Sequence, residues 1–189
     1  MPMNAIHRKI CNSRRWGRAV SDSIIPWTLD GLDLGGDVLE IGPGFAATTR
    51  VLAQRPGRLT ALEIDPASAK RLAEELGERA RIVEGDGTAM PFPDDSYSGV
   101  ACFTMLHHVP SPALQDRLFA EAVRVLQPGG TFAGSDSQPS LTMTLIHLRD
   151  TLVPVPPETL AQRLTAAGLA EVEVTTRRGR VRFRGVKPG

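Results

Sequence analysis

Two acidic residues and a glycine-rich turn have the types and spacing needed to hold a nucleoside. The apolar run 37–41 carries Glu40 and leads into Gly-Pro-Gly at 42–44, and glycines in such a turn let the backbone approach a ligand closely. Glu63 ends the next apolar run, 19 residues after Gly44, where a carboxylate can accept hydrogen bonds from both hydroxyls of a ribose. Either feature alone is weak evidence, because tight turns and charged strand ends are common.

Alternating strands and helices are expected to position these residues, which predicts an α/β fold with a parallel sheet covered by helices on both faces. Strands are predicted at 37–41, 59–64, 81–85, 99–106 and 131–137, and helices at 46–54, 66–76, 112–126 and 157–168. Residues 128–130 are predicted to form a turn, and residues 138–156 to be irregular. Two alternating runs, 171–176 and 180–186, predict an antiparallel hairpin at the sheet edge.

The bulk composition indicates one globular domain over residues 1–189, long enough to bury a core without disulfides. Cys11 and Cys102 lie far apart and lack the spacing of a zinc site. The start of the chain lacks the apolar segment of a signal peptide, and no run approaches the roughly 18 apolar residues of a membrane span. We therefore expect a cytoplasmic protein.

Both ends of the chain are basic, although the formal net charge is only +1. Residues 1–20 carry five cations and no acid, and residues 171–189 carry six cations and two acids. Such ends can bind nucleic acid or an anionic substrate. The C-terminal arginines alternate with apolar residues, however, which favours a solvated strand face.

Further motifs in residues 37–134 resemble the class I S-adenosylmethionine-dependent methyltransferases, in the subgroup common among small-molecule methylases. The motifs are, in order, EIGPG at 40–44, the acid Glu63, DG at 86–87, PFPDDSY at 91–97, LHHV at 106–109 and RVLQPGG at 124–130. The segment AAGLAEVEV at 166–174 is similar to the family's closing helix and strand. The resemblance implies a Rossmann-like, mostly parallel seven-stranded sheet with an antiparallel edge hairpin.

The resemblance also implies which residues hold the methionine end of S-adenosylmethionine. Gly42 and Gly44 would underlie the methionine part, and Glu40 would reach its amino group, directly or through water. Phe103, near the end of the fourth predicted strand, would touch the same end of the cofactor.

The nucleoside end of the cofactor would be held by the next two motifs. Glu63 would accept the ribose hydroxyls, and Ile64 would pack on the adenine. Asp86 would accept a hydrogen bond from the adenine amino group, with the backbone N–H of Gly87 nearby.

Two positions depart from the family's pattern. Ala46 stands where a third glycine is usual, and it would weaken binding if that position requires a positive φ. Ser98 stands where an acid usually precedes the fourth strand, so any role of that carboxylate is absent. An inactive member of the family is therefore one alternative interpretation.

The catalytic residues stay unassigned from sequence. Methyl transfer needs in-line placement of a nucleophile, and a base only when that nucleophile is a hydroxyl or a protonated amine. His107 or His108, after the fourth strand, or His147 farther along, could supply that base. No metal is expected, because Ser98 replaces one acid and Asp136 stands alone at the end of the fifth strand.

The expected acceptor is a small molecule, with no specific nucleic acid and no membrane as partner, and the oligomeric state is left open. A nucleic-acid methyltransferase is the main alternative, although FTML at 103–106 replaces the motif that base methylases usually carry there. A nicotinamide-dependent oxidoreductase fits GPGFAA but leaves Asp86 and the later motifs unexplained. Residues 1–30 are expected to form a helical lid or scaffold, with Trp16 either in the core or over the cofactor.

Overall fold

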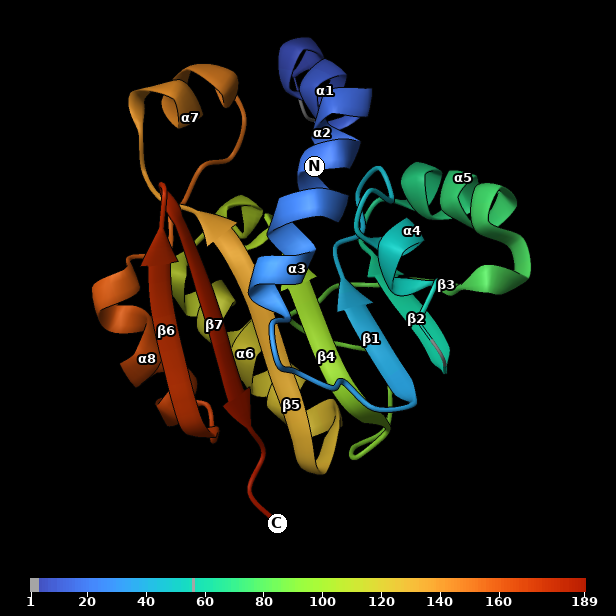
Figure 1. Cartoon of the computed structure of the whole chain (residues 1–189), viewed down its shortest axis with the longest axis vertical. Coiled ribbons are helices and arrows are strands. Elements are labelled where there is room, and N and C mark those ends of the chain that lie inside the picture. Colours follow the sequence, from blue (N-terminus) through green and yellow to red (C-terminus); the bar gives the residue numbers. More distant parts are fainter. Residues whose placement is uncertain (1–3, 56) are drawn as a thin grey trace.

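A seven-stranded sheet with strand order β3-β2-β1-β4-β5-β7-β6 forms the centre of the protein in the computed structural model, which describes residues 4–55 and 57–189 (Figure 1). The strands are β1 (Asp37–Ile41), β2 (Arg58–Glu63), β3 (Arg81–Glu84), β4 (Tyr97–Phe103), β5 (Leu126–Ser137), β6 (Ala170–Arg177) and β7 (Arg180–Val186). Strands β1 to β5 pair in parallel, whereas β7 is antiparallel to both β5 and β6. The predicted fold class, including the antiparallel hairpin at the edge, is confirmed.

Helices cover both faces of this sheet. The elements along the chain are α1 (Ala5–Cys11), α2 (Arg14–Ala19), the π-helical turn η1 (Val20–Ile24), α3 (Ile25–Thr28), α4 (Thr49–Leu52), α5 (Pro66–Leu76), η2 (Gly77–Arg79), η3 (Leu106–His108), α6 (Pro112–Val125), α7 (Leu141–Ile146) and α8 (Pro157–Ala166). One core cluster contains the apolar residues of α6 and α8, and the other contains those of η1, α3, α4 and α5. Among the described residues, no helix is long and apolar enough to cross a membrane.

The ends of α5 show why the sequence predicted this helix correctly. The Asp65 carboxylate accepts a hydrogen bond from the Ser68 N–H at 2.8 Å, and Pro66 occupies the first helical position. Leu72 and Leu76 are buried four residues apart on one face, and Gly77 ends the helix with a φ of +54°. The capping residues and the apolar spacing both indicate the same helix, so α5 can be predicted from its own sequence without knowledge of distant contacts.

Two predicted segments differ in the structure. Residues 138–156 were expected to be irregular, but they contain α7, whose start is capped by the Ser140 hydroxyl accepting from the Met143 N–H at 3.1 Å. Residues 128–130 were expected to turn before the fifth strand, but they lie within β5. Gly129 donates to the Lys187 carbonyl and Lys187 donates to the Gly130 carbonyl, so the glycine pair continues the pairing with the C-terminal segment.

The N-terminal segment, expected to be a helical lid or scaffold, is helical almost throughout residues 5–28. The caps of α1 and α2 are Asn4 and Ser13, whose side chains accept from the N–H groups of His7 and Trp16. Val20 and the two isoleucines that follow are buried against the sheet. The segment is thus packed on the sheet along its second half, while α1 lies above the carboxyl ends of the parallel strands (Figure 1).

Candidate active site

A cavity, here called the turn cavity, lies at the carboxyl ends of β1, β2 and β4. Its walls come from the turn after β1, the ends of β2 and β4, η3 and the N-terminal helices. The predicted cofactor residues that line it are Gly42, Gly44, Glu63, Ile64 and Phe103. Glu40 is buried beneath it, and Asp86 and Gly87 lie after β3, outside its lining. This is the sheet edge where ligands bind in open α/β folds.

The turn after β1 has a left-handed backbone at three positions. Gly42 has a φ of +70°, Gly44 of +56° and Ala46 of +59°. A Cβ at Gly42 would also lie 3.1 Å from the Met105 side chain, so the backbone conformation favours glycine there and the space for a side chain is tight. Ala46 is fully buried in a conformation that costs an alanine about 1–2 kcal/mol. The usual third glycine is therefore replaced at a position that does adopt a positive φ.

Two side chains from neighbouring elements hold this turn. The Gly44 N–H donates to Glu63 Oε2 at 3.2 Å, and the Arg71 guanidinium donates to the Gly44 carbonyl at 2.9 Å. The other carboxylate oxygen of Glu63 accepts from the Asp65 N–H at 3.0 Å. Glu63 is thereby fixed at the cavity wall, and each of its oxygens keeps lone-pair capacity for a ligand.

Glu40 is buried beneath the turn with one oxygen unsatisfied. The Thr48 hydroxyl donates to Oε1, whereas Oε2 has no hydrogen-bond partner among the described residues. Burial raises the pKa of Glu40 to about 7, helped by the nearby charge of Glu63 and against the lowering effect of the Thr48 and Thr49 hydroxyls. A buried carboxyl oxygen without a partner is expensive, which suggests a ligand group as its partner.

A second cavity, here called the histidine cavity, adjoins the turn cavity. The two cavities share His7, Cys11, Trp16 and Thr104 in their linings. The histidine cavity continues under α7 and beside the β6–β7 turn. Thr104 has a φ of +51°, a strained conformation for a β-branched residue, and its N–H donates to the Ser135 carbonyl at 2.7 Å.

His107 and Asp136 form a buried pair in the wall of the histidine cavity. His107 Nδ1 lies 2.5 Å from Asp136 Oδ1, and the His107 backbone N–H donates to Oδ2 at 3.0 Å. Burial alone would raise the pKa of Asp136, but its interactions with His107 outweigh burial and lower it below the usual value. The pair leaves His107 Nε2 as the ring nitrogen free to meet a ligand.

The other departure, Ser98, lies at the opposite end of the sheet from both cavities. It falls inside β4 rather than before it, and its hydroxyl accepts from the Asp37 N–H at 2.9 Å. It also contacts the carbonyl oxygens of Leu34 and Asp37. In the described structure Ser98 holds the segment that leads into β1 against β4.

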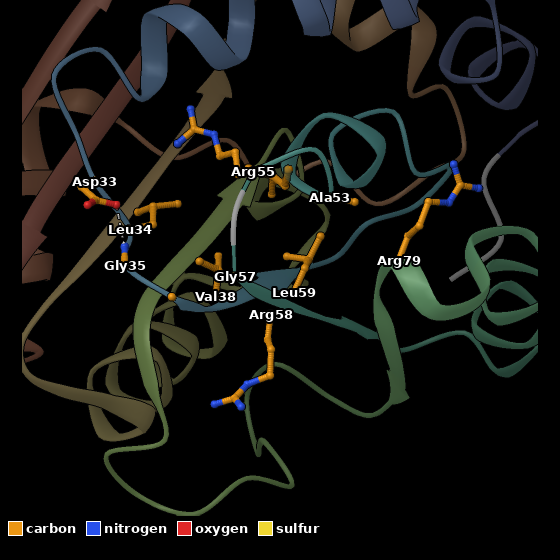
Figure 2. Close-up of a pocket in the computed structure, with 12 residues that line it drawn as sticks. Asp33, Leu34, Gly35, Val38, Ala53, Arg55, Gly57, Arg58, Leu59 and Arg79 are labelled. Carbon is orange, nitrogen blue, oxygen red and sulfur yellow. Dashed lines mark hydrogen bonds between the residues drawn. The ribbon is translucent and has the colours of Figure 1, made fainter.

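A further cavity at that opposite end is lined by three arginines. Arg55, Arg58 and Arg79 surround it, and Figure 2 shows their guanidinium groups pointing away from one another. Arg58 is paired with the Asp37 carboxylate at 2.5 and 2.8 Å. Since the cations diverge and this is the amino end of β1 and β2, the cavity lacks the convergence expected of an anion site.

Comparison with known proteins identifies the family of the chain. A family model described as a methyltransferase domain matches residues 39–134. The erythromycin 3''-O-methyltransferase of Saccharopolyspora erythraea is 29% identical over 175 residues, 80% of this chain and 56% of that protein. A sterol 24-C-methyltransferase of Gibberella zeae is 32% identical over 108 residues, 54% of this chain and 28% of that protein. The matched segments thus make up little more than half of one relative and less than a third of the other.

Solved structures show the same fold. A SAM-dependent methyltransferase from Methanosarcina mazei matches with a TM-score of 0.67 and 20% identity, over 83% of this chain and 94% of that one. The sheet order and the antiparallel edge hairpin define a Rossmann-like class I methyltransferase fold. The chain belongs to the methyltransferase-domain family.

Sequence reasoning missed several residues of these walls. Thr48, Met105, His7 and Cys11 line the turn cavity without having been singled out. Thr48 stands eight residues after Glu40 and could have been suspected from the turn that joins them. His7 carried no signal, because it reaches the site only through the packing of α1 over the strand ends.

The buried carboxyl group of Glu40 should make the stability of the ligand-free protein depend on pH. Between about pH 4.5 and 7 the unfolded chain releases this proton while the native state keeps it, so the free energy of unfolding falls as pH rises. The shift corresponds to a contribution on the order of 3 kcal/mol. Glu40→Gln should therefore flatten the decline measured by urea unfolding across this range. Glu74→Gln, at an exposed acid on α5, is the control, and an unchanged slope in Glu40→Gln would contradict the assignment.

Proposed function

We propose that this protein transfers a methyl group from S-adenosylmethionine to a small-molecule acceptor. The observation that carries the proposal is the junction of two cavities at the carboxyl edge of the sheet, sharing His7, Cys11, Trp16 and Thr104. A methyl donor and an acceptor must meet within about 3 Å and in line with the departing sulfur. Two adjoining cavities provide that arrangement, with the donor in the turn cavity and the acceptor in the histidine cavity.

The residues of the turn cavity fit S-adenosylmethionine. The partnerless Oε2 of Glu40 suits the ammonium group of the methionine part, which the glycine turn would underlie. Glu63 would accept the ribose hydroxyls, and the half-exposed Ile64 offers an apolar surface for the adenine. Phe103 would contact the methionine end, while Asp86 and Gly87, beyond the cavity, would meet the outer edge of the adenine. The bound cofactor supplies an activated methyl group on a sulfonium.

The residues of this chain would orient the acceptor and take its proton. His107 is proposed as the general base, because Asp136 holds its Nδ1 and fixes the tautomer that presents Nε2 to the cavity. Such a base serves an acceptor that attacks through a hydroxyl. The O-methyltransferase relative is named for an oxygen acceptor, which supports this choice.

A small acceptor is favoured over nucleic acid because several C-terminal cations make contacts within the chain. Arg182 donates to the Trp27 carbonyl and stacks on its ring, and Arg180 lies over the Trp16 ring. Arg184 and Lys187 are paired with acids. Cations engaged within the chain are poorly placed to neutralise phosphates. A small-molecule acceptor is accordingly part of the proposal, which separately keeps the cytoplasmic location expected from the sequence.

Cofactor binding should depend on Glu63. We expect the protein to bind S-adenosylhomocysteine with a Kd in the low-to-mid micromolar range, roughly −7 to −8 kcal/mol. Glu63→Ala should weaken binding by about 2–3 kcal/mol, because charge-assisted hydrogen bonds to the ribose are lost. Glu63→Gln should lose less. Titration calorimetry measures all three affinities.

The matched control is Glu84→Ala, since Glu84 pairs with Glu63 on the neighbouring strand but does not line the turn cavity. It should bind as the parent does. Equal affinity of the parent and Glu63→Ala would disprove the ribose assignment. Binding of NADH without S-adenosylhomocysteine would replace the proposal by the oxidoreductase alternative.

The proposed base can be tested separately from cofactor binding. His107→Gln and Asp136→Asn should each lower kcat for a hydroxyl acceptor by roughly 10²–10⁴-fold, because proton removal is lost or the tautomer is no longer fixed. Affinity for S-adenosylhomocysteine should stay at the parent value in both variants. Radiolabelled methyl transfer to erythromycin, for which the O-methyltransferase relative is named, measures the rate. Asp116→Asn, at an exposed acid on α6, is the control. Full turnover in His107→Gln would exclude this base.

A further inference from the structure

Every histidine of the chain lines one or both of the two cavities. The sequence has four histidines, at 7, 107, 108 and 147, and the fold brings their rings together from α1, η3 and the end of α7. The ring centroids of His7 and His147 are 4.2 Å apart, and each is 5.2 Å from His108. One possible ligand nitrogen from each of these three residues lies within 4.8 Å of the other two.

Two of these rings are oriented by a hydrogen bond at Nδ1. His7 Nδ1 lies 3.1 Å from Asp150 Oδ2, and His147 Nδ1 lies 2.8 Å from the Met143 carbonyl oxygen. Asp150 is itself held by the Asn4 N–H at 2.8 Å. A carboxylate or carbonyl on one imidazole nitrogen is the usual support for metal ligation through the other.

His147 provides an independent sign that a ligand is expected. Its side chain is buried, with the residue 6% exposed, and its Nε2 has no hydrogen-bond partner among the described residues. Buried polar nitrogens are rarely left without a partner. An ion between the three rings would satisfy it.

We propose that His7, His108 and His147 hold one divalent transition-metal ion, of which Zn²⁺ is the best match. Imidazole is a preferred ligand of zinc, copper and nickel, and three histidines with a fourth open position form a recognised zinc arrangement. At zinc–nitrogen distances of 2.0–2.1 Å the ligand nitrogens would lie about 3.3 Å apart, so the rings close inward on binding. The sequence predicts no metal held by carboxylates, whereas this site consists of imidazoles.

The ion would connect segments that are distant in the sequence. His7 lies on α1 and His147 just after α7, the two helices above the carboxyl ends of the strands, and His108 lies on η3 directly after the β4 edge (Figure 1). The bound ion would therefore connect α1 and α7 to the carboxyl edge of the sheet. Since His7 lines both cavities, the ion would lie beside their junction. The inference concerns metal binding and stands apart from the proposed methyl transfer.

The test is metal binding by the full-length protein after treatment with a chelator. Calorimetric titration with Zn²⁺ should give one equivalent bound, and Zn²⁺ should raise Tm. His7→Gln and His147→Gln should each weaken binding by about 100-fold or more, and Asp150→Asn by about 10–100-fold. All three variants are compared by their thermal transitions without metal, so that a loss of binding is separated from a loss of folding.

Cys11→Ser is the matched control, because the Cys11 thiol lines both cavities but is not one of the proposed ligands. It should bind Zn²⁺ as the parent does. The parent loaded with Co²⁺ should show visible d–d bands without the near-ultraviolet band of a thiolate ligand, a readout that requires no variant. Failure to bind either ion, undiminished binding by the histidine variants, or a thiolate band lost in Cys11→Ser would each overturn the proposal.

Discussion

The left-handed turn between β1 and α4 is the constraint on which the site depends. Gly42, Gly44 and Ala46, at every second position of the turn, have positive φ, and the last of them is an alanine. The turn persists because Glu63 accepts from the Gly44 N–H while Arg71 donates to the Gly44 carbonyl. These contacts join the exits of β1 and β2 to α5, so the positions of the glycines and of the ribose-binding carboxylate are set together.

The carboxylates and the imidazoles at the sheet edge occupy separate regions. Acidic oxygens gather under the turn, where Glu40 has an unsatisfied oxygen and Glu63 a fixed carboxylate. The imidazoles lie on the other side of Thr104, around the histidine cavity. Burial lowers the pKa of His108 to about 3 there and also lowers the pKa of His7 and His147. Neutral imidazoles present lone pairs, whereas the acidic side suits a cationic group. One edge of the sheet thus offers two adjoining environments of different kind.

The parts of the fold that were predictable are those determined by neighbours in sequence. Buried strands, capped helices such as α5, and the hairpin turn at Arg178-Gly179 all follow from local patterns. The helix after the glycine turn was expected over 46–54 but α4 covers Thr49–Leu52, because Ala46 adopts a conformation that a right-handed helix excludes. The histidine junction was not predictable, since His7 and Asp150 meet across 143 positions of sequence. Only the packing of α1 and α7 brings such residues together.

The central claim is that the turn cavity holds the nucleoside of the methyl donor with its sulfur at the junction of the two cavities. A crystal structure of the protein with S-adenosylhomocysteine tests this most directly. The account predicts ribose hydroxyls at about 2.7–3.2 Å from the Glu63 carboxylate and the sulfur facing Thr104. A nucleoside bound at the opposite end of the sheet, among Arg55, Arg58 and Arg79, would contradict it.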